Sequence, residues 1–392
     1  MPGKDPALSA ALDAQAREIA DVFGDAGYEL VEPRILQPAD IFLERAGEEI
    51  RQRTYVFSDP GGAMLCLRPD LTVPTCRYYL ERGPGDGSEA RYRYHGPAFR
   101  YQPAGEDGMH PREFEQAGIE YFGGRDAEAA EVEVATLGIA AVERAGLTDY
   151  RIRLGDLGLF SALLRAVPMP ERWRRRLMHH FWRPHAFRET LTRLASPRPA
   201  PAGEAASLLQ QLKGADPARA RELVGDMLAA SGTPLFGGRG IDEIAERLLD
   251  KVRDLDARPL DRAAANAIES YLAVRGHPRE ALATVTDLAA RSAIDIDAAL
   301  AACDRRLTLL ADQGVDLDRS LFSAEFGRNL EYYTGFVFQI EVDGRRGAVP
   351  LAGGGRYDGL MQDIGANGPI PAVGCAIHTE RLLVAVRGEA AS

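Results

Sequence analysis

The sequence predicts an α+β protein whose sheet-forming domain is interrupted by a helical insertion. Strand patterns occur at residues 64–67, 91–101, 117–122 and 150–154, and they return after residue 320. Between about residues 168 and 313, Arg, Ala, Leu and Glu dominate and strand patterns are few. Strands, then helices, then strands again are typical of an interrupted α+β domain. We therefore expect a first core part at 1–167, a mostly helical insertion at 168–313 and a second core part at 314–392.

The first core part is expected to begin with an amphipathic helix at residues 7–23. Its apolar residues recur at near-helical spacing, and glycines follow its end. An extended piece at 28–31 leads to Pro33, which cannot donate a hydrogen bond to a sheet and suits an edge. Asp126 can cap a long helix that ends at Gly146.

The insertion is expected to hold several helices, separated by breaks rich in Pro or Gly at 196–204 and 231–240. In the second core part, residues 332–342 are aromatic and β-branched, as is typical of a strand. A turn leading into a helix is expected at 351–360. A short apolar strand and a closing helix complete this part of the chain.

Composition excludes several classes of protein. The chain has 392 residues, of which 45% are hydrophobic and 27% charged, as in ordinary folded domains. Its formal net charge of −11 disfavours general binding of nucleic acid or anionic membrane. No run of 18 apolar residues and no secretory leader are visible, so we expect a cytoplasmic protein.

The four cysteines are dispersed along the chain, at Cys66, Cys76, Cys303 and Cys375. No pair has C-x-x-C spacing, which argues against zinc-ribbon and thioredoxin-like motifs. This usage fits a reducing compartment, and we expect no metal and no cofactor.

Four segments combine glycine turns, arginines beside aromatic residues and carboxylates at strand positions. They are L-R-P-D-L-T at 67–72, the stretch at 99–120, G-R-N-L-E-Y-Y-T-G at 327–335 and G-G-G-R-Y-D-G-L at 353–360. Charged residues that face inward on strands are costly unless they are paired or used. These segments are therefore candidates for a binding site, and a structural ion-pair network is the alternative.

A zwitterion clamp is the sharper interpretation of these segments. If Asp70, Glu120, Arg100 and Arg328 share one sheet face, the carboxylates can hold an ammonium group and an arginine can hold a carboxylate. Tyrosines at 332, 333 and 357 can shape a flat, polar ring pocket.

The ordered set of segments resembles the catalytic domain of histidyl-tRNA synthetase, a class II aminoacyl-tRNA synthetase. The matches are L-R-P-D-x-T, F-R followed by R-E-F-x-Q-x-G-x-E, R-N-L-E-Y-Y-T-G, and G-G-G-R-Y-D-G-L followed by P-A-V-G and E-R. They cover roughly residues 7–160 and 320–387 in the family's order. The resemblance implies a class II synthetase-like antiparallel sheet flanked by helices, with a helical insertion.

Departures from the synthetase pattern disfavour catalysis. Only 11 residues follow Arg381, so no C-terminal anticodon-binding domain is expected. His378 stands where the family's A-x-G-x-E-R motif has glycine, and it fills space that ATP uses unless its ring turns to solvent. Gln102 replaces the glutamate that meets adenine. The loop at 103–111 has two carboxylates and no arginine, which repels ATP and tRNA.

The amino-acid pocket of the family, by contrast, is kept. The residues that we expect to bind histidine are Asp70, Thr72, Arg100, Gln116, Glu120, Arg328, Tyr332, Tyr333 and Tyr357. A histidine pocket without ATP or tRNA machinery resembles the regulatory subunits of ATP phosphoribosyltransferase, which are synthetase paralogues. Asp70, one methylene shorter than the synthetase's glutamate, fits these regulatory subunits better.

That resemblance implies a non-catalytic subunit, without catalytic residues of its own. It implies activation of the short-form catalytic subunit and histidine feedback inhibition in the first step of histidine biosynthesis. L-histidine is then the effector, and the ordering of residues 353–358 is the expected local event. The resemblance also implies a homodimer formed near residues 28–35 within a hetero-oligomer, for which a hetero-octamer is one candidate.

Two other functions remain open. A trimmed synthetase that still forms histidyl adenylate is supported by the retained Arg100 and Arg328. An RNA-binding module is the other, because seven arginines lie within residues 172–193. A solvated or partner-facing helix explains that basic run better, and tRNA binding is not expected. The adjacent His179 and His180 point about 100° apart on a helix, so they are poor joint metal ligands.

Overall fold

The computed structural model describes residues 4–44, 48–83, 87–102, 111–197, 209–231, 241–328, 332–344 and 347–388. The chain divides into two compact units. The first contains Met1–Val167 and Ala267–Ser392, and the second contains Pro168–Asn266. The insertion expected at 168–313 extends beyond the second unit, because helices after residue 266 pack within the first. The breaks expected at 196–204 and 231–240 lie largely outside the described residues.

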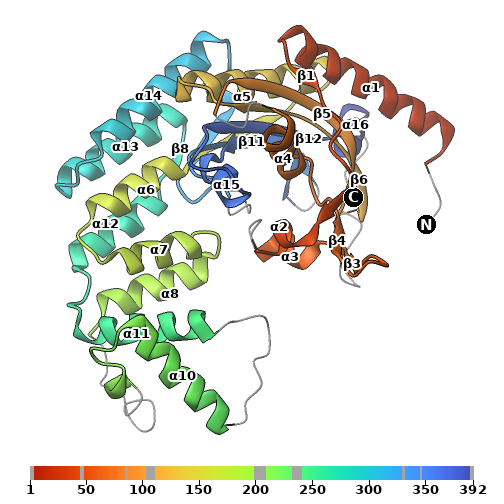
Figure 1. Cartoon of the computed structure of the whole chain (residues 1–392). Coiled ribbons are helices and arrows are strands. Elements are labelled where there is room, and N and C mark those ends of the chain that lie inside the picture. The colour runs from red at the N-terminus through yellow and green to blue at the C-terminus, as the bar shows by residue number, and fades with distance from the viewer. Residues whose placement is uncertain are drawn as a thin grey trace. The chain divides into compact units, whose positions relative to one another are not determined.

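A nine-stranded sheet forms the centre of the first unit (Figure 1). Its order is β1-β5-β6-β12-β11-β10-β7-β9-β8. Neighbouring strands are antiparallel except for the pairs β1–β5 and β7–β9, which are parallel. The predicted fold class is confirmed, with these two parallel pairs as the difference. In sheet order the bounds are β1 Glu29–Leu30, β5 Ala90–Phe99, β6 Glu113–Phe122, β12 Ala372–His378, β11 Gly347–Arg356, β10 Phe336–Gly344, β7 Arg151–Asp156, β9 Ser320–Ser323 and β8 Arg275–Gly276.

Long helices cover the sheet. Figure 1 shows α5 (Ala127–Arg144) crossing the strands, and it packs against β11, β12, α1 and α14. The cap predicted at Asp126 is present, since its side chain accepts from Ala129 N. The structure adds a cap at the start of α1 (Pro6–Asp25), where the Asp5 side chain accepts from Leu8 N. The other helices of this unit are α6 Leu157–Ala166, α13 Pro278–Arg291, α14 Asp297–Asp312, α15 Asp358–Asp363 and α16 Thr379–Val386, with a 3-10 turn at Leu317–Arg319. Helix α12 (Arg262–Leu272) begins before residue 267.

A second, three-stranded sheet carries the L-R-P-D-L-T segment. Its antiparallel strands are β2 (Leu36–Pro38), β4 (Met64–Leu67) and β3 (Val56–Ser58), with β4 in the centre. Helices α2 (Ala39–Glu44), α3 (Glu48–Arg53) and α4 (Thr72–Arg82) accompany it. Directly after β4, Arg68 donates to Pro97 O at 2.7 Å and to Pro33 O at 2.5 Å. These bonds fix the segment beside the end of β5.

The second unit is helical. Its helices are α7 Glu171–His180, α8 Pro184–Ala195, α10 Pro217–Ser231 and α11 Ile241–Asp256. Trp173 is buried, and its Nε1 donates to Asp254 at 2.5 Å, while Arg172 and Arg176 pair with the same carboxylate. Phe181 is also buried, so Trp173 and Phe181 pack the interior of this unit. Part of the basic run therefore forms ion pairs with an acid inside this unit.

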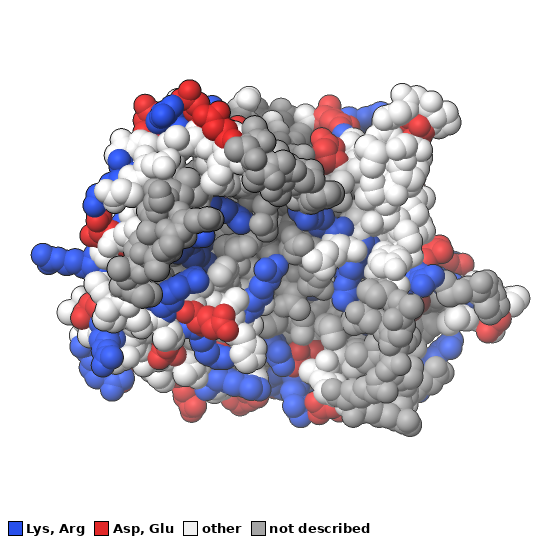
Figure 2. All heavy atoms as spheres, turned by 90° about the horizontal axis from the view of Figure 1, so that it is seen from below, with Lys and Arg blue, Asp and Glu red and all other residues white. Residues whose placement is uncertain are grey.

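Among the described residues, no helix combines the length and the apolar character that spanning a lipid bilayer requires. The same residues contain no group of three His, Cys, Asp or Glu side chains placed to hold a metal ion. All four cysteines are buried as free thiols. Figure 2 shows many Lys and Arg side chains on the face that it draws, with Asp and Glu side chains interspersed among them.

Candidate functional site

A cavity of about 240 Å³ lies over the centre of the nine-stranded sheet, in the first unit. The strands β6, β11 and β12 supply its floor, and the segments that precede α4 and follow β11 supply its walls. All nine residues expected to form the amino-acid pocket line it, namely Asp70, Thr72, Arg100, Gln116, Glu120, Arg328, Tyr332, Tyr333 and Tyr357. Segments far apart in the sequence thus meet at one place.

Glu120 is the fully buried acid at the inner end of the cavity. Its Oε1 accepts from Tyr94 Oη at 3.0 Å, and its Oε2 accepts from Tyr357 Oη. Burial raises the pKa of Glu120 to about 8, although these hydroxyls and that of Thr72 oppose the rise. A Cβ on Gly374 of the neighbouring strand would lie 1.6 Å from Oε2, so only glycine leaves room for this carboxyl.

Asp70 is the second buried acid of the cavity. Its Oδ1 accepts from Val73 N at 3.1 Å, in the first turn of α4, and the side chain of Gln116 holds the preceding loop by accepting from Leu71 N. Its Oδ2 has no hydrogen-bond partner among the described residues. Burial raises the pKa of Asp70. A buried oxygen without a partner is expensive, so this atom points to a donor on a ligand.

Arg328 and three tyrosines form the opposite side. Arg328 has a φ of +52°, in the left-handed region that non-glycine residues rarely adopt. Its guanidinium lies against Gly353, where an added Cβ would come within 2.6 Å of Cζ, and it donates to Tyr333 Oη at 3.2 Å. The ring of Tyr332 lies 4.8 Å from that of Tyr333 and 5.8 Å from that of Tyr357. The tyrosines therefore make a continuous aromatic wall.

The outer end of the cavity is basic and partly filled. Arg53, Arg100 and Arg381 line it. The His378 ring stacks on Phe114, with 4.6 Å between centroids and 16° between planes. The side chain of His378 is 13% exposed, so it turns into the cavity, and the alternative in which it rotates to solvent does not occur.

This arrangement suits a small zwitterion. Two carboxyl groups at the inner end can accept from an ammonium or imidazole group, and guanidinium groups can hold a carboxylate. The aromatic wall suits a flat ring between them. The expected loop at 103–111 lies outside the described residues except for Pro111, and so do residues 329–331.

Sequence reasoning missed several residues that line the cavity or bond to its buried acid. Arg53 comes from α3, outside every motif, and Gln339 comes from β10. Tyr94 alternates inward on β5, but its pairing with Glu120 depends on strand register, which local pattern does not reveal. Phe114 lies inside a quoted motif, and its stacking partner is only visible in three dimensions.

The comparisons with known proteins agree with this geometry. The family model described as histidyl-tRNA synthetase matches residues 4–231 and 239–382. An ATP phosphoribosyltransferase regulatory subunit from Chelativorans sp. is 36% identical over 378 residues, covering 95% of this chain and 97% of that protein. One from Brucella canis is 36% identical over 356 residues, covering 90% and 92%.

Solved structures share the fold. An ATP phosphoribosyltransferase regulatory subunit/histidyl-tRNA synthetase from Bacillus halodurans matches with a TM-score of 0.67 and 23% identity, covering 98% of this chain and 82% of that one. A histidine–tRNA ligase subunit from Alicyclobacillus acidocaldarius matches with a TM-score of 0.60 and 24% identity, covering 99% and 96%. At these identities the likeness establishes the architecture alone.

Proposed function

We propose that this chain binds L-histidine in the cavity and regulates a separate catalytic subunit. The premise is that it belongs to the histidyl-tRNA synthetase family and, within it, to the ATP phosphoribosyltransferase regulatory subunits. The observation that carries the proposal is the inner end of the cavity. There the unpartnered Oδ2 of Asp70 and the buried carboxyl of Glu120 face the same space. A ligand with an amino group and an imidazole offers donors to both.

The regulatory step follows from the position of the ligand. The partner is a short-form catalytic subunit, which the chain activates and through which histidine inhibits the first step of histidine biosynthesis in the cytoplasm. Histidine can act only if it binds one arrangement of the complex more tightly than another. The wall that ends at Tyr357 is our candidate for the element that responds, since it closes directly on the ligand space.

A homodimer is proposed as the core of the assembly, which also contains the catalytic subunits. Leu30, Ile35 and Leu36 are large apolar side chains that stand exposed around the short edge strands β1 and β2. An exposed apolar group of this kind is typical of an interface. This region matches the segment at 28–35 expected to pair two copies.

The filled outer end supports a role without catalysis in this chain. Because His378 already covers one face of Phe114, a nucleobase cannot stack there. The Arg100 guanidinium carbon lies 5.2 Å from the centre of the same ring. Formation of histidyl adenylate needs ATP beside the amino acid, so this stack disfavours it, although Arg100 and Arg328 are retained.

The test is the turnover of the short catalytic subunit, with and without this chain, across concentrations of L-histidine. Glu120→Ala and Tyr333→Ala are expected to abolish inhibition while activation survives. Glu18→Ala, on the exposed surface of α1, is the matched control and should keep both. Inhibition that persists in both cavity variants would refute the proposed site. ATP–pyrophosphate exchange that depends on histidine would instead indicate adenylate chemistry.

A further inference from the structure

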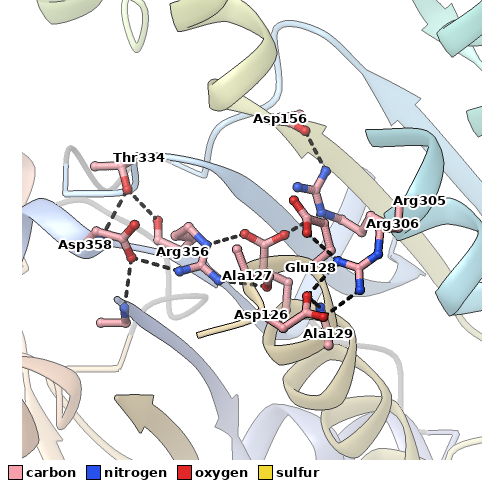
Figure 3. Close-up of polar contacts among 12 residues, drawn as sticks. Asp126, Ala127, Glu128, Ala129, Asp156, Arg305, Arg306, Thr334, Arg356 and Asp358 are labelled. Carbon is pink, nitrogen blue, oxygen red and sulfur yellow. Dashed lines mark hydrogen bonds and ion pairs between the residues drawn. The ribbon is translucent and has the colours of Figure 1, made fainter. Parts of the chain in front are cut away.

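Arg356 and Asp358 flank a cavity residue but have no place in the proposed ligand contacts. They belong to the same G-G-G-R-Y-D segment as Tyr357. In the structure their side chains join a charge cluster behind the sheet, within the first unit (Figure 3), which is buried except for the half-buried Asp358. We call this group the buried ion cluster, and its members are Glu131, Asp156, Arg306, Arg356 and Asp358.

Each nitrogen of the Arg356 guanidinium has its own acceptor. Nε donates to Glu131 Oε1, Nη1 donates to Asp358 Oδ1 at 3.0 Å, and Nη2 donates to Ala127 O at 2.8 Å. Burial disfavours the charged form of Arg356, but attraction to Glu131 and Asp358 outweighs it and raises its pKa. The guanidinium is therefore fixed in direction as well as in charge.

Glu131 connects this arginine to a second helix. Its Oε2 accepts from Arg306 Nε at 2.5 Å, and Arg306 Nη1 donates to Asp156 Oδ2 at 2.7 Å. The side chains of Glu131, Arg306 and Asp156 are only 2%, 7% and 6% exposed. Asp156 also caps α6 by accepting from Leu159 N. The end of β11 is thereby tied to α5, α14 and the start of α6 (Figure 3).

Backbone bonds carry this placement into the cavity wall. Thr334 N, directly after Tyr333, donates to Arg356 O at 2.8 Å. Asp358 Oδ1 accepts from Ala372 N, and Tyr357 N donates to Ala372 O, both at 2.8 Å. Tyr333 and Tyr357, two of the three tyrosines of the wall, are thus next in sequence to a residue that the cluster holds.

We propose that Arg356 and Glu131 are positioning residues of the cavity, which set the orientation of Tyr333 and Tyr357 and, through Tyr357, the hydrogen bond to Glu120. The proposal rests on the proposed function and names what keeps its site in shape. Replacing buried ion pairs by apolar side chains is often neutral or stabilising, so stability alone explains such a cluster poorly. The cluster is better explained by a role in fixing the direction of the end of β11.

Glu131→Gln is the informative variant. It removes one negative charge and leaves Arg306 and Arg356 balanced by Asp156 and Asp358. It keeps the size of the side chain, but one arginine loses its acceptor. The matched control is Arg305→Gln, which removes the exposed ion pairs to Asp126 and Glu128 at the same helix junction. Figure 3 shows both sets of contacts side by side.

The first readout is binding of L-histidine to the full chain by calorimetry from pH 6 to pH 9. We expect Glu131→Gln to weaken binding about tenfold, because Glu120, the acid that faces the ligand, loses one hydrogen bond to its charged group. The pH midpoint of binding should also move up by about one pH unit, because the Tyr357 hydroxyl favours the ionised Glu120. The ligand's own titration is the same for every variant and cancels in the comparison.

The second readout needs no ligand. The groups that face Glu120 are Asp70, Thr72, Cys76, Tyr94, Arg328, Tyr332, Tyr333, Tyr357 and Cys375. Of the tyrosine hydrogen bonds to Glu120, only the one from Tyr357 should change in Glu131→Gln. The free energy of unfolding is measured against pH with and without Glu120→Gln, and the difference reports the titration of Glu120. Its midpoint should show the same upward shift in Glu131→Gln. Tyr357→Phe should reproduce this upward shift, and combining Tyr357→Phe with Glu131→Gln should give no further shift.

The outcomes separate the two proposals. If Glu131→Gln binds L-histidine and titrates in the same way as Arg305→Gln, the positioning role is refuted. Weaker binding with an unmoved midpoint would also refute it, since a purely structural defect lowers stability without changing the Glu120 titration. If the natural chain does not bind L-histidine, the proposed function fails, and the titration without ligand still decides the positioning role. Arg356→Lys should retain part of the natural affinity for L-histidine, because lysine keeps the charge of arginine but cannot make its forked hydrogen bonds.

Discussion

Glu120→Gln should change how the stability of the first unit depends on pH. The folded pKa of this carboxyl is about 8, against 4.5 for an ordinary glutamate, because burial disfavours its charge. A raised folded pKa means that the native state holds the proton more tightly. The associated stability is fully present below pH 4.5 and is lost as the pH rises towards 8.

The size of this effect follows from the two pKa values. Between pH 5 and pH 8 such a carboxyl lowers the free energy of unfolding by about 3.5 kcal/mol. Glutamine keeps the shape and cannot ionise, so the variant should lack this slope. The difference between the two proteins cancels the titrating groups that do not interact with Glu120.

Hydrogen exchange of the β6 and β12 amides is the assay, since it reports the opening free energy of the first unit locally. Both tryptophans, Trp173 and Trp182, lie in the second unit, so unfolding followed by their fluorescence provides an internal control. That signal should respond to pH identically in both proteins. Parallel curves of opening free energy against pH for the natural chain and the variant would refute the reasoning.

Three further predictions concern the cavity. Asp70→Asn should weaken binding of L-histidine at least tenfold by calorimetry, as expected for losing a charged acceptor, and unchanged affinity would remove Asp70 from the site. Gly374→Ala should abolish that binding because its Cβ would come within 1.6 Å of the Glu120 carboxyl, and full binding would contradict the packing. His378→Gly should uncover Phe114 and yield detectable binding of adenosine monophosphate, whereas no gain over the natural chain would show that the stack is not what excludes a base.

The sequence was informative where function is written in short motifs. Each predicted pocket residue lies in one of four segments, and all nine line one cavity, although their binding role stays a prediction. Glycines were recognised as turn signals, but their use is different. Gly353 and Gly374 remove side chains from a sheet face so that Arg328 and Glu120 can lie against it.

Features that depend on distant pairing could not be read from the sequence. Glu131 and Arg306 are 175 residues apart and belong to no motif, so nothing local marks them as partners. The expected insertion at 168–313 ran past residue 266 for a similar reason. The helices α13 and α14 look like those before them in composition. They are assigned to the first unit by contacts in three dimensions, since α14 packs on α5 and α6 and α13 packs on β8 and β9.

The register of β6 and β12 has a consequence for the order in which the site comes into being. Glu120 pairs with Gly374, and the two strands are separated by most of the chain. Until β12 joins the sheet, β6 has no neighbour on that side, and the Glu120 carboxyl lacks the cover that β12 provides. Its proton affinity rises only when β12 arrives and covers it. Completion of the sheet, the uptake of a proton and the creation of the ligand cavity therefore depend on the same step, the pairing of β12 with β6.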